Sequence, residues 1–323
     1  MCCNIYMYPP YSKNNFIKIN NEILTGIGHV VKPANIKMLK ELFGFRNDTV
    51  VILNWAEDLL YGLTTLGATK QFFKTVLLIL ISSMLASRVI WVRHNYKPHN
   101  SRGSFKRYNF ICFLFRILGV SPIPLERYYS TPSLIHPLYK TDEVIRNDLR
   151  LVDAVDLKYE VVFFGAIKPY KNLHKTLKEW PISLPLKVVG KCSDAKYKKS
   201  IENIISEREL NVDWDENFVS DDKLNQILKE SRFVLLPHED GTMISSGSFY
   251  HSIGEGCNVL VNNSTFGSFK SEKHSFVHNI PISEVNQNTL DKIFVRKSIV
   301  MKEAIDSYGI NNVANAWKSV LNV

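Results

Sequence analysis

Short runs of apolar residues alternate with longer segments in which apolar residues recur every three or four positions. The short runs lie at 3–8, 49–54, 89–92, 161–164, 186–189, 233–236 and 259–261. Apolar residues at helical spacing occupy 16–27, 173–180, 194–207, 221–230 and 297–323. Short apolar runs that alternate with helical segments are typical of parallel strands joined by crossover helices. The pattern therefore predicts an α/β fold with parallel sheets.

One apolar segment, 76–87, approaches the composition of a membrane span. Its sequence is VLLILISSMLAS, with Lys74 before it and Arg88 after it. The run is shorter than the ~20 apolar residues that a spanning helix needs. Because the strand predicted at 89–92 follows at once, we expect a buried helix that leads into this strand.

The chain length and the placement of charge both indicate two domains. A chain of 323 residues usually forms two domains, and we place them at 1–150 and 151–323. The first part holds 19 Lys and Arg against 9 Asp and Glu, whereas the second holds 21 against 22. This asymmetry indicates that the first domain meets something anionic, such as phosphates, nucleic acid or a membrane surface.

The cysteines and the N-terminus bear on the compartment. The five cysteines form no CxxC pair and no zinc-ligand spacing. This usage favours a reducing compartment without a structural metal. Met1 leads into Cys2 without the basic residues that open a secretory signal. We therefore expect a cytoplasmic protein.

A basic, aromatic-rich segment at 104–118 stands within the basic region 88–127. This region holds eight basic residues and one acid, Glu126. A helix of this composition fits a membrane interface with anionic head groups, so we expect contact with the inner-membrane surface. The alternative is a surface helix with a solvated basic edge. No recognition helix, RNP motif or zinc finger accompanies it, so we expect no nucleic-acid binding.

Polar clusters follow the predicted strands of the first domain, at 9–15, 55–58 and 94–99. In parallel sheets, ligands bind beyond the carboxyl ends of the strands. Glu57, Asp58 and His94 are therefore candidate bases. The alternatives are ordinary ones: an acid can complement a helix dipole, and a histidine can simply hydrogen-bond its own loop.

The stretch 231–262 has a strand–loop–helix–strand pattern with small residues where the helix begins. The run at 233–236 ends at Pro237, and Ser245, Ser246, Gly247 and Ser248 precede the helical segment. A helix N-terminus carries unpaired N–H groups and partial positive charge, so it suits an anion such as a phosphate. An ordinary N-cap is the alternative.

Several of these segments together resemble GT-B glycosyltransferases, especially those that build bacterial surface polysaccharides. FFGAIKPYKNLHKTL at 163–177 is similar to the family's phosphate-neutralising loop, and PHEDGTMISSGSFYHSIGEG at 237–256 to its diphosphate-binding loop and helix. Stretch 217–236 is similar to the family's approach to the donor site. The first half shows further similar segments at 9–31, 53–58, 91–100 and 135–139. Each motif is loose, and their order along the chain gives the resemblance its weight.

The resemblance implies an architecture. It implies two Rossmann-like domains that face each other across a cleft, an N-terminal domain for the acceptor and a C-terminal domain for the nucleotide-sugar donor. It also implies that the last helix crosses back and packs on the first domain.

The resemblance also implies roles for individual residues. Lys171 matches the cation that neutralises the donor diphosphate, and Glu239 matches the first acid of a Glu-x7-Glu pattern found in retaining members. Gly247 stands where the second acid would be, which puts a retaining mechanism in doubt. The implied donor-binding set is Gly165, Lys168, Lys171, Asn172, Glu239, Ser245, Ser246, Gly247 and Ser248.

For the acceptor and the chemistry, the resemblance leaves several choices. The implied acceptor residues are Tyr11, Asn14, Trp55 and Asn95. The candidate catalytic residues are Asp58, Glu57, His94 and Glu239. Lysines and helix N–H groups would stabilise the leaving diphosphate, and no DxD motif is placed as a metal site, so we expect no metal and no cofactor beyond the nucleotide sugar.

The leading functional hypothesis is a hexosyltransferase of surface polysaccharide (capsule or lipopolysaccharide) biosynthesis. It would transfer a sugar from a nucleotide donor to a lipid-linked or oligosaccharide acceptor at the cytoplasmic face of the membrane, as a peripheral protein. One alternative is a sugar-nucleotide epimerase of the same fold, which would act without an acceptor. Another is a non-catalytic partner of a second transferase.

Overall fold

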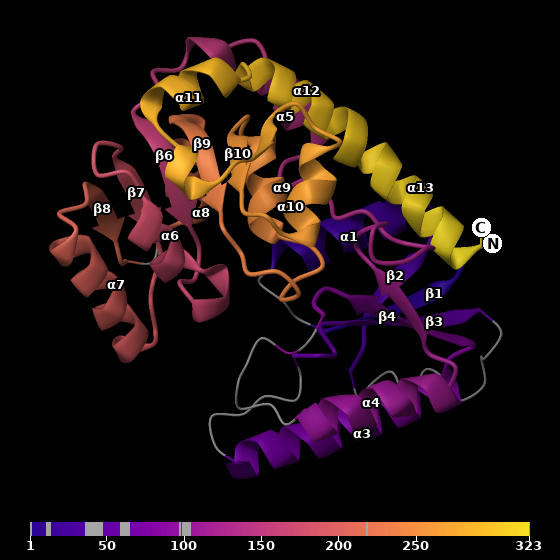
Figure 1. Ribbon diagram of the computed structural model, residues 1–323. Coiled ribbons are helices and arrows are strands. Elements are labelled where there is room, and N and C mark those ends of the chain that lie inside the picture. The colour runs from indigo at the N-terminus through magenta and orange to yellow at the C-terminus, as the bar shows by residue number, and fades with distance from the viewer. Residues whose placement is uncertain are drawn as a thin grey trace. The chain divides into compact units, whose positions relative to one another are not determined.

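The computed structural model describes residues 2–10, 14–35, 48–58, 65–96, 98, 105–217 and 219–322, and these form two compact units (Figure 1). The first unit comprises Met1–Pro137, Thr242–Ser245 and Ile310–Val323, and the second unit comprises Leu138–Gly241 and Ser246–Gly309. The predicted boundary at 150/151 lies inside the second unit, and two later segments return to the first unit.

The first unit contains a five-stranded sheet in the order β2-β1-β3-β4-β5, with every neighbouring pair parallel. Its strands are β1 (Asn4–Tyr8), β2 (Val30–Pro33), β3 (Thr49–Asn54), β4 (Arg88–Arg93) and β5 (Ser121–Pro124). The chain moves outward from β1 to β2 and then returns to place β3 on the other side of β1. The point between β1 and β3 is therefore the switch point, where such sheets bind ligands.

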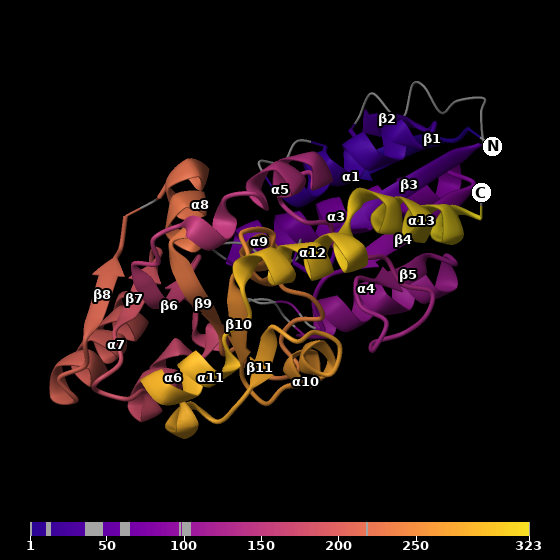
Figure 2. The same ribbon diagram turned by 90° about the horizontal axis from the view of Figure 1, so that it is seen from above.

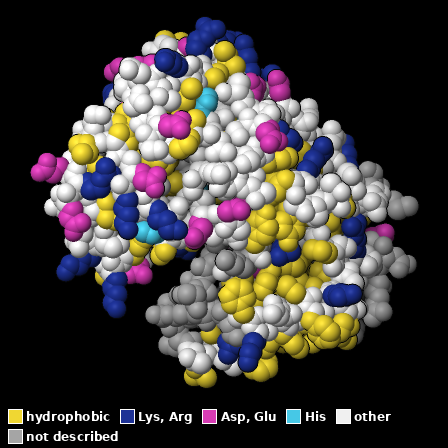
Figure 3. Space-filling model, viewed as in Figure 1, with side chains coloured by type: hydrophobic (Ala, Val, Ile, Leu, Met, Phe, Trp, Pro, Cys, Tyr) yellow, Lys and Arg dark blue, Asp and Glu magenta, His cyan; other side chains and the backbone are white. Residues whose placement is uncertain are grey.

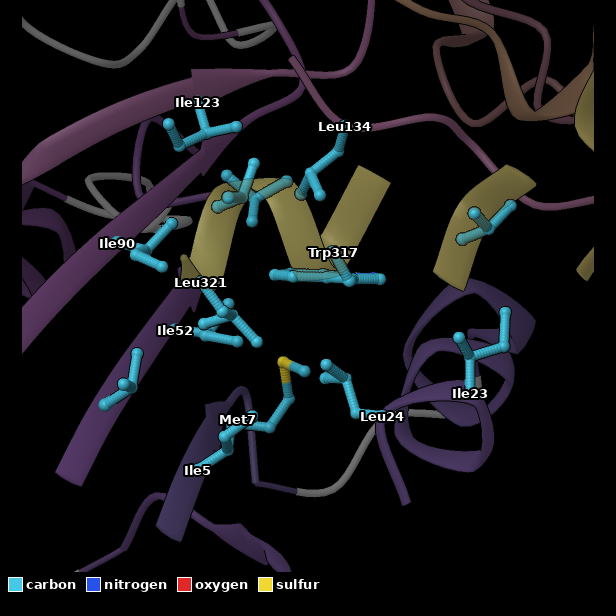
Figure 4. Packing of buried hydrophobic residues seen from close by; sticks show 14 of the residues in the cluster. Ile5, Met7, Ile23, Leu24, Ile52, Ile90, Ile123, Leu134, Trp317 and Leu321 are labelled. Carbon is cyan, nitrogen blue, oxygen red and sulfur yellow. The ribbon is translucent and has the colours of Figure 1, made fainter. Parts of the chain in front are cut away.

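Helices cover this sheet on both faces. They are α1 (Asn15–Gly26), α3 (Thr65–Leu85), α4 (Phe105–Ile117) and the C-terminal α13 (Ile310–Leu321). Figure 4 shows Trp317 and Leu321 of α13 pointing into the same core as Met7, Leu24 and Ile52. The last helix thus packs on the first unit, as predicted.

The second unit contains a six-stranded parallel sheet in the order β11-β10-β9-β6-β7-β8 (Figure 2). Its strands are β6 (Tyr159–Phe164), β7 (Leu186–Val189), β8 (Val212–Asp215), β9 (Ser231–Leu236), β10 (Asn258–Val261) and β11 (Val277–Asn279). The strand order reverses between β6 and β9, which makes that point the switch point of the second unit. The order is that of a Rossmann domain.

The helices of the second unit connect these strands. They are α5 (Asp142–Asp148), η1 (Val152–Ala154), η2 (Pro169–Lys171), α6 (Leu173–Glu179), α7 (Ala195–Glu207), α8 (Asp221–Lys229), α9 (Gly247–Gly254), α10 (Thr265–Ser271), η3 (Ile282–Glu284), α11 (Gln287–Ile293) and α12 (Lys297–Tyr308). The predicted C-terminal helical segment 297–323 is two helices, because α12 ends at Tyr308 and α13 begins at Ile310.

The expected helix at 76–87 that leads into the next strand is present as part of α3, which β4 follows, but the expectation that it is buried is wrong. The helix is longer, running over Thr65–Leu85, and only 22% of its most apolar window is buried. It is long and apolar enough to cross a membrane by length and composition, with a mean hydropathy of 1.3. One face packs on the sheet through Ile79, whereas another exposes Phe73 and Met84.

Candidate functional site

Lys171 is the centre of the candidate site in the second unit. It ends the short helix η2 after β6, and its side chain is only 8% exposed. Its ammonium donates to the carbonyl of Phe164 at 3.3 Å. No carboxylate among the described residues forms an ion pair with it. Burial, and then the nearby charge of Lys168, lower the pKa of Lys171 to about 8. A buried cation without an anion is a ready partner for an anionic ligand.

The first turn of α9 lies against the same point. A Cβ atom added to Gly165 would lie 2.9 Å from the Lys171 Nζ and 3.9 Å from the Ser248 Oγ. Gly165 has a φ of +93°, which suits glycine. The turn after β6 therefore brings a bare backbone, an ammonium and a hydroxyl together at the N-terminus of a helix. Backbone N–H groups and the helix dipole favour an anion there.

The cap of α9, like those of α6 and α12, makes no side-chain hydrogen bond to its helix, whereas the caps of α5, α7, α8, α10 and α11 do. The side chains of Asp194, Ser220 and Ser264 each accept a hydrogen bond from the first turn of their own helix. Ser246, the N-cap of α9, makes no such bond although it is buried. The Phe249 N–H donates to the Ser246 carbonyl at 3.0 Å, whereas the N–H groups of Gly247 and Ser248 are not occupied by a capping side chain, so a ligand can accept from these two.

The other predicted donor residues near Lys171 differ in their exposure and in their contacts. Lys168 is exposed at the N-cap of η2, and Asn172 is a buried residue in the left-handed region at φ +62°. Glu239 lies beside η2, because its N–H donates to the carbonyl of Tyr170 at 3.0 Å. Its carboxylate contacts the exposed Lys175 at 3.3 Å. The structure thus brings Gly165, Lys168, Lys171, Asn172, Glu239, Ser246, Gly247 and Ser248 to the switch point of the second unit.

Ser245 belongs to the first unit, where its hydroxyl donates to the Glu126 carboxylate at 3.1 Å. Glu255 cannot replace the acid missing at position 247, because it caps the opposite end of α9 and pairs with Lys140. Sequence reasoning grouped Ser245 with its neighbours because a tertiary change of unit leaves no mark in a run of serines.

In the first unit, Glu57 links the ends of two strands. It follows β3 and is fully buried. Its carboxylate accepts hydrogen bonds from the Trp91 indole at 2.9 Å and from the backbone N–H groups of His94 and Asn95, both at 3.0 Å. Burial, and then the charge of Asp58, raise the pKa of Glu57 to about 7. With its oxygens occupied and no exposed surface, Glu57 holds the loop after β4 in place and is removed from the candidate bases.

Asp58 is the more accessible carboxylate of this pair. Its side chain is partly exposed, and the amide of Asn95 donates to its Oδ2 at 3.1 Å. Asn95 is itself fixed through its backbone by Glu57. The predicted residues Glu57, Asp58 and Asn95 thus form one connected group after β3 and β4, with the Asp58 carboxylate as its accessible member.

His94 lies in an aromatic cluster. Its ring stacks on Trp55 at 4.3 Å between centroids, and Phe16 meets it edge-on at 4.9 Å. Its Nε2 lies 3.3 Å from the Asn54 Oδ1. Trp55 has a φ of +50°, an uncommon conformation for a bulky residue. His136, which also packs on Phe16, is a member that residue patterns did not single out.

The other two predicted acceptor residues have different outcomes. Asn14 is the N-cap of α1, where its side chain accepts a hydrogen bond from Phe16 N–H at 2.9 Å. Tyr11 lies outside the described residues. Within the part of the chain that the structure describes, no three His, Cys, Asp or Glu side chains group as a metal site would require.

Solved glycosyltransferases resemble the chain over its whole length. HepE of Anabaena, in complex with UDP-glucose, has a TM-score of 0.63 at 10% identity, with 100% of both chains covered. AviGT4, a glycosyltransferase involved in avilamycin A biosynthesis, has a TM-score of 0.58 at 12% identity, covering 98% of this chain and 96% of its own. A glycosyltransferase of Rickettsia africae has a TM-score of 0.51 at 12% identity, covering 99% and 98%.

The chain has the GT-B fold. No protein-family model and no curated protein sequence matches it. The likeness to the solved structures confirms the predicted fold class. At identities of 10–12%, it shows the fold and nothing finer. In this GT-B fold, the switch point of the second unit carries Lys171 and the first turn of α9. Asp58 follows β3, which borders the switch point of the first unit.

Proposed function

We propose that the chain is a glycosyltransferase that takes a sugar from a nucleoside diphosphate sugar. The observation that carries the proposal is the buried, carboxylate-free ammonium of Lys171 beside the first turn of α9. A diphosphate has the charge and the acceptor oxygens that both groups need. The likeness in fold to HepE, which was crystallised with UDP-glucose, supports a nucleotide sugar as its source.

In the proposed reaction, these groups stabilise the leaving group. Breaking the bond between sugar and diphosphate places growing negative charge on the departing phosphate oxygens. Lys171 and the N–H groups of α9 meet this charge, with Lys168 as a second, exposed cation. Because they supply positive charge themselves, we propose a reaction that needs no metal ion.

We further propose that Asp58 is the base that activates the acceptor. Asn95 holds the Asp58 carboxylate, and Glu57 holds the backbone of Asn95. The carboxylate removes the proton of the acceptor hydroxyl as that oxygen attacks the sugar carbon. Direct attack inverts the configuration at this carbon. The glycine at 247, where retaining members carry an acid, supports this stereochemistry.

The acceptor and the location complete the proposal. We propose a saccharide acceptor that is carried on a lipid and extended at the cytoplasmic face of the membrane, as in surface polysaccharide biosynthesis, with a hexose as the transferred sugar. The excess of basic residues in the first half, 19 against 9 acids, supports an anionic surface or a lipid diphosphate as its neighbour.

The test has two steps. First, nucleotide sugars are screened for stabilisation of the protein; a donor at ~100 times its Kd adds roughly 2.7 kcal/mol to the free energy of unfolding. The donor is then incubated with saccharide and lipid-linked saccharide acceptors, and the anomer of the product is determined by NMR. We expect transfer with inversion. Conversion of the nucleotide sugar without an acceptor would instead indicate an epimerase, and no stabilisation by any nucleotide sugar would contradict the proposal.

A further inference from the structure

The helix α3 presents an apolar stripe to solvent. Its exposed apolar residues, Leu66, Phe73, Leu77, Leu80 and Met84, recur three, four or seven positions apart, which places them on one helical face, with Phe73 64% exposed. The other exposed residues of the helix are Thr65, Lys70 and Lys74. The two lysines lie on the same face, so the stripe is Leu66, Lys70, Phe73, Lys74, Leu77, Leu80 and Met84.

The neighbouring helix α4 carries a second such stripe. Its exposed apolar members are Phe105, Phe110, Phe113 and Ile117. The two helices touch, since the rings of Phe72 and Phe110 lie 5.7 Å apart and Arg107 donates to Thr69 at 2.7 Å. Figure 3 shows hydrophobic side chains gathered over these helices, with Lys and Arg among them. The two stripes together are called the α3–α4 surface below.

The charge around the α3–α4 surface has one sign. The helices carry Lys70, Lys74, Lys106, Arg107 and Arg116, and no acid. In the sequence, no Asp or Glu occurs between Asp58 and Glu126. A group of neighbouring exposed apolar side chains on a folded protein marks an interaction site, and basic residues around it favour an anionic partner.

The opposite face of α3 excludes a spanning role in this fold. Ala68, Thr75, Ile79 and Ser82 are buried, and Ile79 packs with core residues such as Val51 and Trp91. To span a bilayer, α3 would have to leave that core. A helix with one face in the protein core and the other exposed can instead lie in the plane of a membrane interface.

We propose that the α3–α4 surface docks on an anionic lipid bilayer, with Phe73 and Phe113 entering the acyl region and the lysines and arginines contacting head groups. A second copy of the chain is disfavoured as the occupant, because joining two such surfaces would bring like charges together. Anionic lipids neutralise these charges. This inference names the surface that would contact the membrane. It rests on the proposed function for the reason to dock there, which is that the acceptor is carried on a membrane lipid.

The experiment measures sedimentation with vesicles and needs neither donor nor turnover, so failure here leaves the proposed transfer standing. The protein is mixed with vesicles of phosphatidylcholine, with or without phosphatidylglycerol. The apolar variant is F73Q/F113Q, and the charge variant is K74Q/K106Q. The matched control is L151Q/I182Q, which changes side chains 72% and 56% exposed in the second unit.

We expect wild type and control to bind the anionic vesicles, and F73Q/F113Q to bind them roughly tenfold or more weakly, since less apolar area enters the bilayer. K74Q/K106Q should lose most of the preference for phosphatidylglycerol. Equal circular dichroism and melting temperatures show that each variant is folded. Binding of F73Q/F113Q that equals wild type would overturn the proposal. The proposal would also be overturned if the wild type does not bind vesicles and instead forms dimers, and if F73Q/F113Q abolishes these dimers.

Discussion

At the scale of single residues, the buried ammonium of Lys171 costs stability, and the proposed diphosphate would offset this cost. Its ammonium is buried and has no carboxylate among the described residues. Burial disfavours the charged form, so the pKa of about 8 lies below that of an unfolded lysine, near 10.4. The folded protein therefore releases this proton at a lower pH than the unfolded chain does. Below pH 8 the charge destabilises the fold, and this cost disappears as the pH rises through 10.4.

K171M should therefore be more stable than wild type when no ligand is bound. The difference in free energy of unfolding is expected to reach a few kcal/mol below pH 8 and to shrink as the pH approaches 10. Urea unfolding at pH 7 and at pH 10 measures it. K178M, which changes an exposed lysine of α6, should follow wild type at both values. A K171M variant that is less stable than wild type at pH 7 would contradict this account of the lysine.

The adjacent acids Glu57 and Asp58 have different environments despite their neighbouring positions. Glu57 is buried and accepts three N–H groups, whereas Asp58 is partly exposed and accepts the amide of Asn95. Sequence alone offers both as bases, because nothing in two successive acids says which side chain turns inward. Only the sheet, which brings Trp91 beside β3, decides it.

E57Q should therefore change mainly the free energy of unfolding, and D58N should change mainly the rate of transfer. In E57Q, the glutamine NH2 group faces N–H groups that the Glu57 carboxylate accepts in the wild type. We expect this clash of donors in a buried site to lower the free energy of unfolding by about 2 kcal/mol. D58N should leave stability within about 0.5 kcal/mol and lower kcat on the order of 100-fold or more, with the donor Kd unchanged. Urea unfolding and initial rates measure the two effects. The assignment of Asp58 fails if D58N turns over like wild type.

At the scale of elements, the turn after β6 lies close to the Lys171 ammonium and to the turn after β7. Gly165 leaves space for the Lys171 ammonium, and a Cβ on Gly190 would lie 2.1 Å from the Gly165 carbonyl oxygen. The sequence predicts a turn here from the glycine after an apolar run. It does not predict these contacts, because they join the ends of two strands.

G165A should weaken binding of the donor diphosphate and should also lower the free energy of unfolding. Its matched control is G28A, since both glycines have nearly the same φ, +93° and +94°, but Gly28 has no atom within 4 Å of an added Cβ. Both substitutions should cost about 1 kcal/mol of stability from backbone strain. Only G165A should also raise the Kd for a nucleoside diphosphate, because its methyl group displaces Lys171. Equal Kd values for the two variants would show that the ammonium does not bind where we place it.

The elements that sequence reasoning found and missed differ in burial. The central strands were predicted because both their faces are apolar, as in VVILN of β3. The outer strands β2, β8 and β11 were missed, since they are short and partly exposed, and β5 was missed because it contains two prolines. The helix α3 was predicted to be buried because an apolar face has the same spacing whether it meets a core or a membrane.

At the scale of the whole molecule, the alternation of strands and helices predicted parallel sheets, chain length and charge predicted two domains, and the family resemblance implied that both are Rossmann-like. The exact division was not predictable. Thr242–Ser245 joins the first unit through bonds such as that from Ile244 N–H to the His94 carbonyl, and α13 joins it by burying Trp317. These partners lie more than a hundred residues away, so no local pattern marks them. The family resemblance singled out Lys171, and the structure buries this lysine at the switch point of the second unit, while its role in donor binding stays a prediction.

The central claim is that Lys171 and the first turn of α9 bind the diphosphate of a nucleotide sugar. Isothermal titration of wild type, K171M and K178M with uridine, guanosine, adenosine and thymidine diphosphates tests it most directly. We predict that at least one of these ligands binds wild type and K178M equally and binds K171M roughly 30-fold or more weakly. The claim is contradicted if K171M binds as wild type does, or if none of the nucleoside diphosphates binds at all.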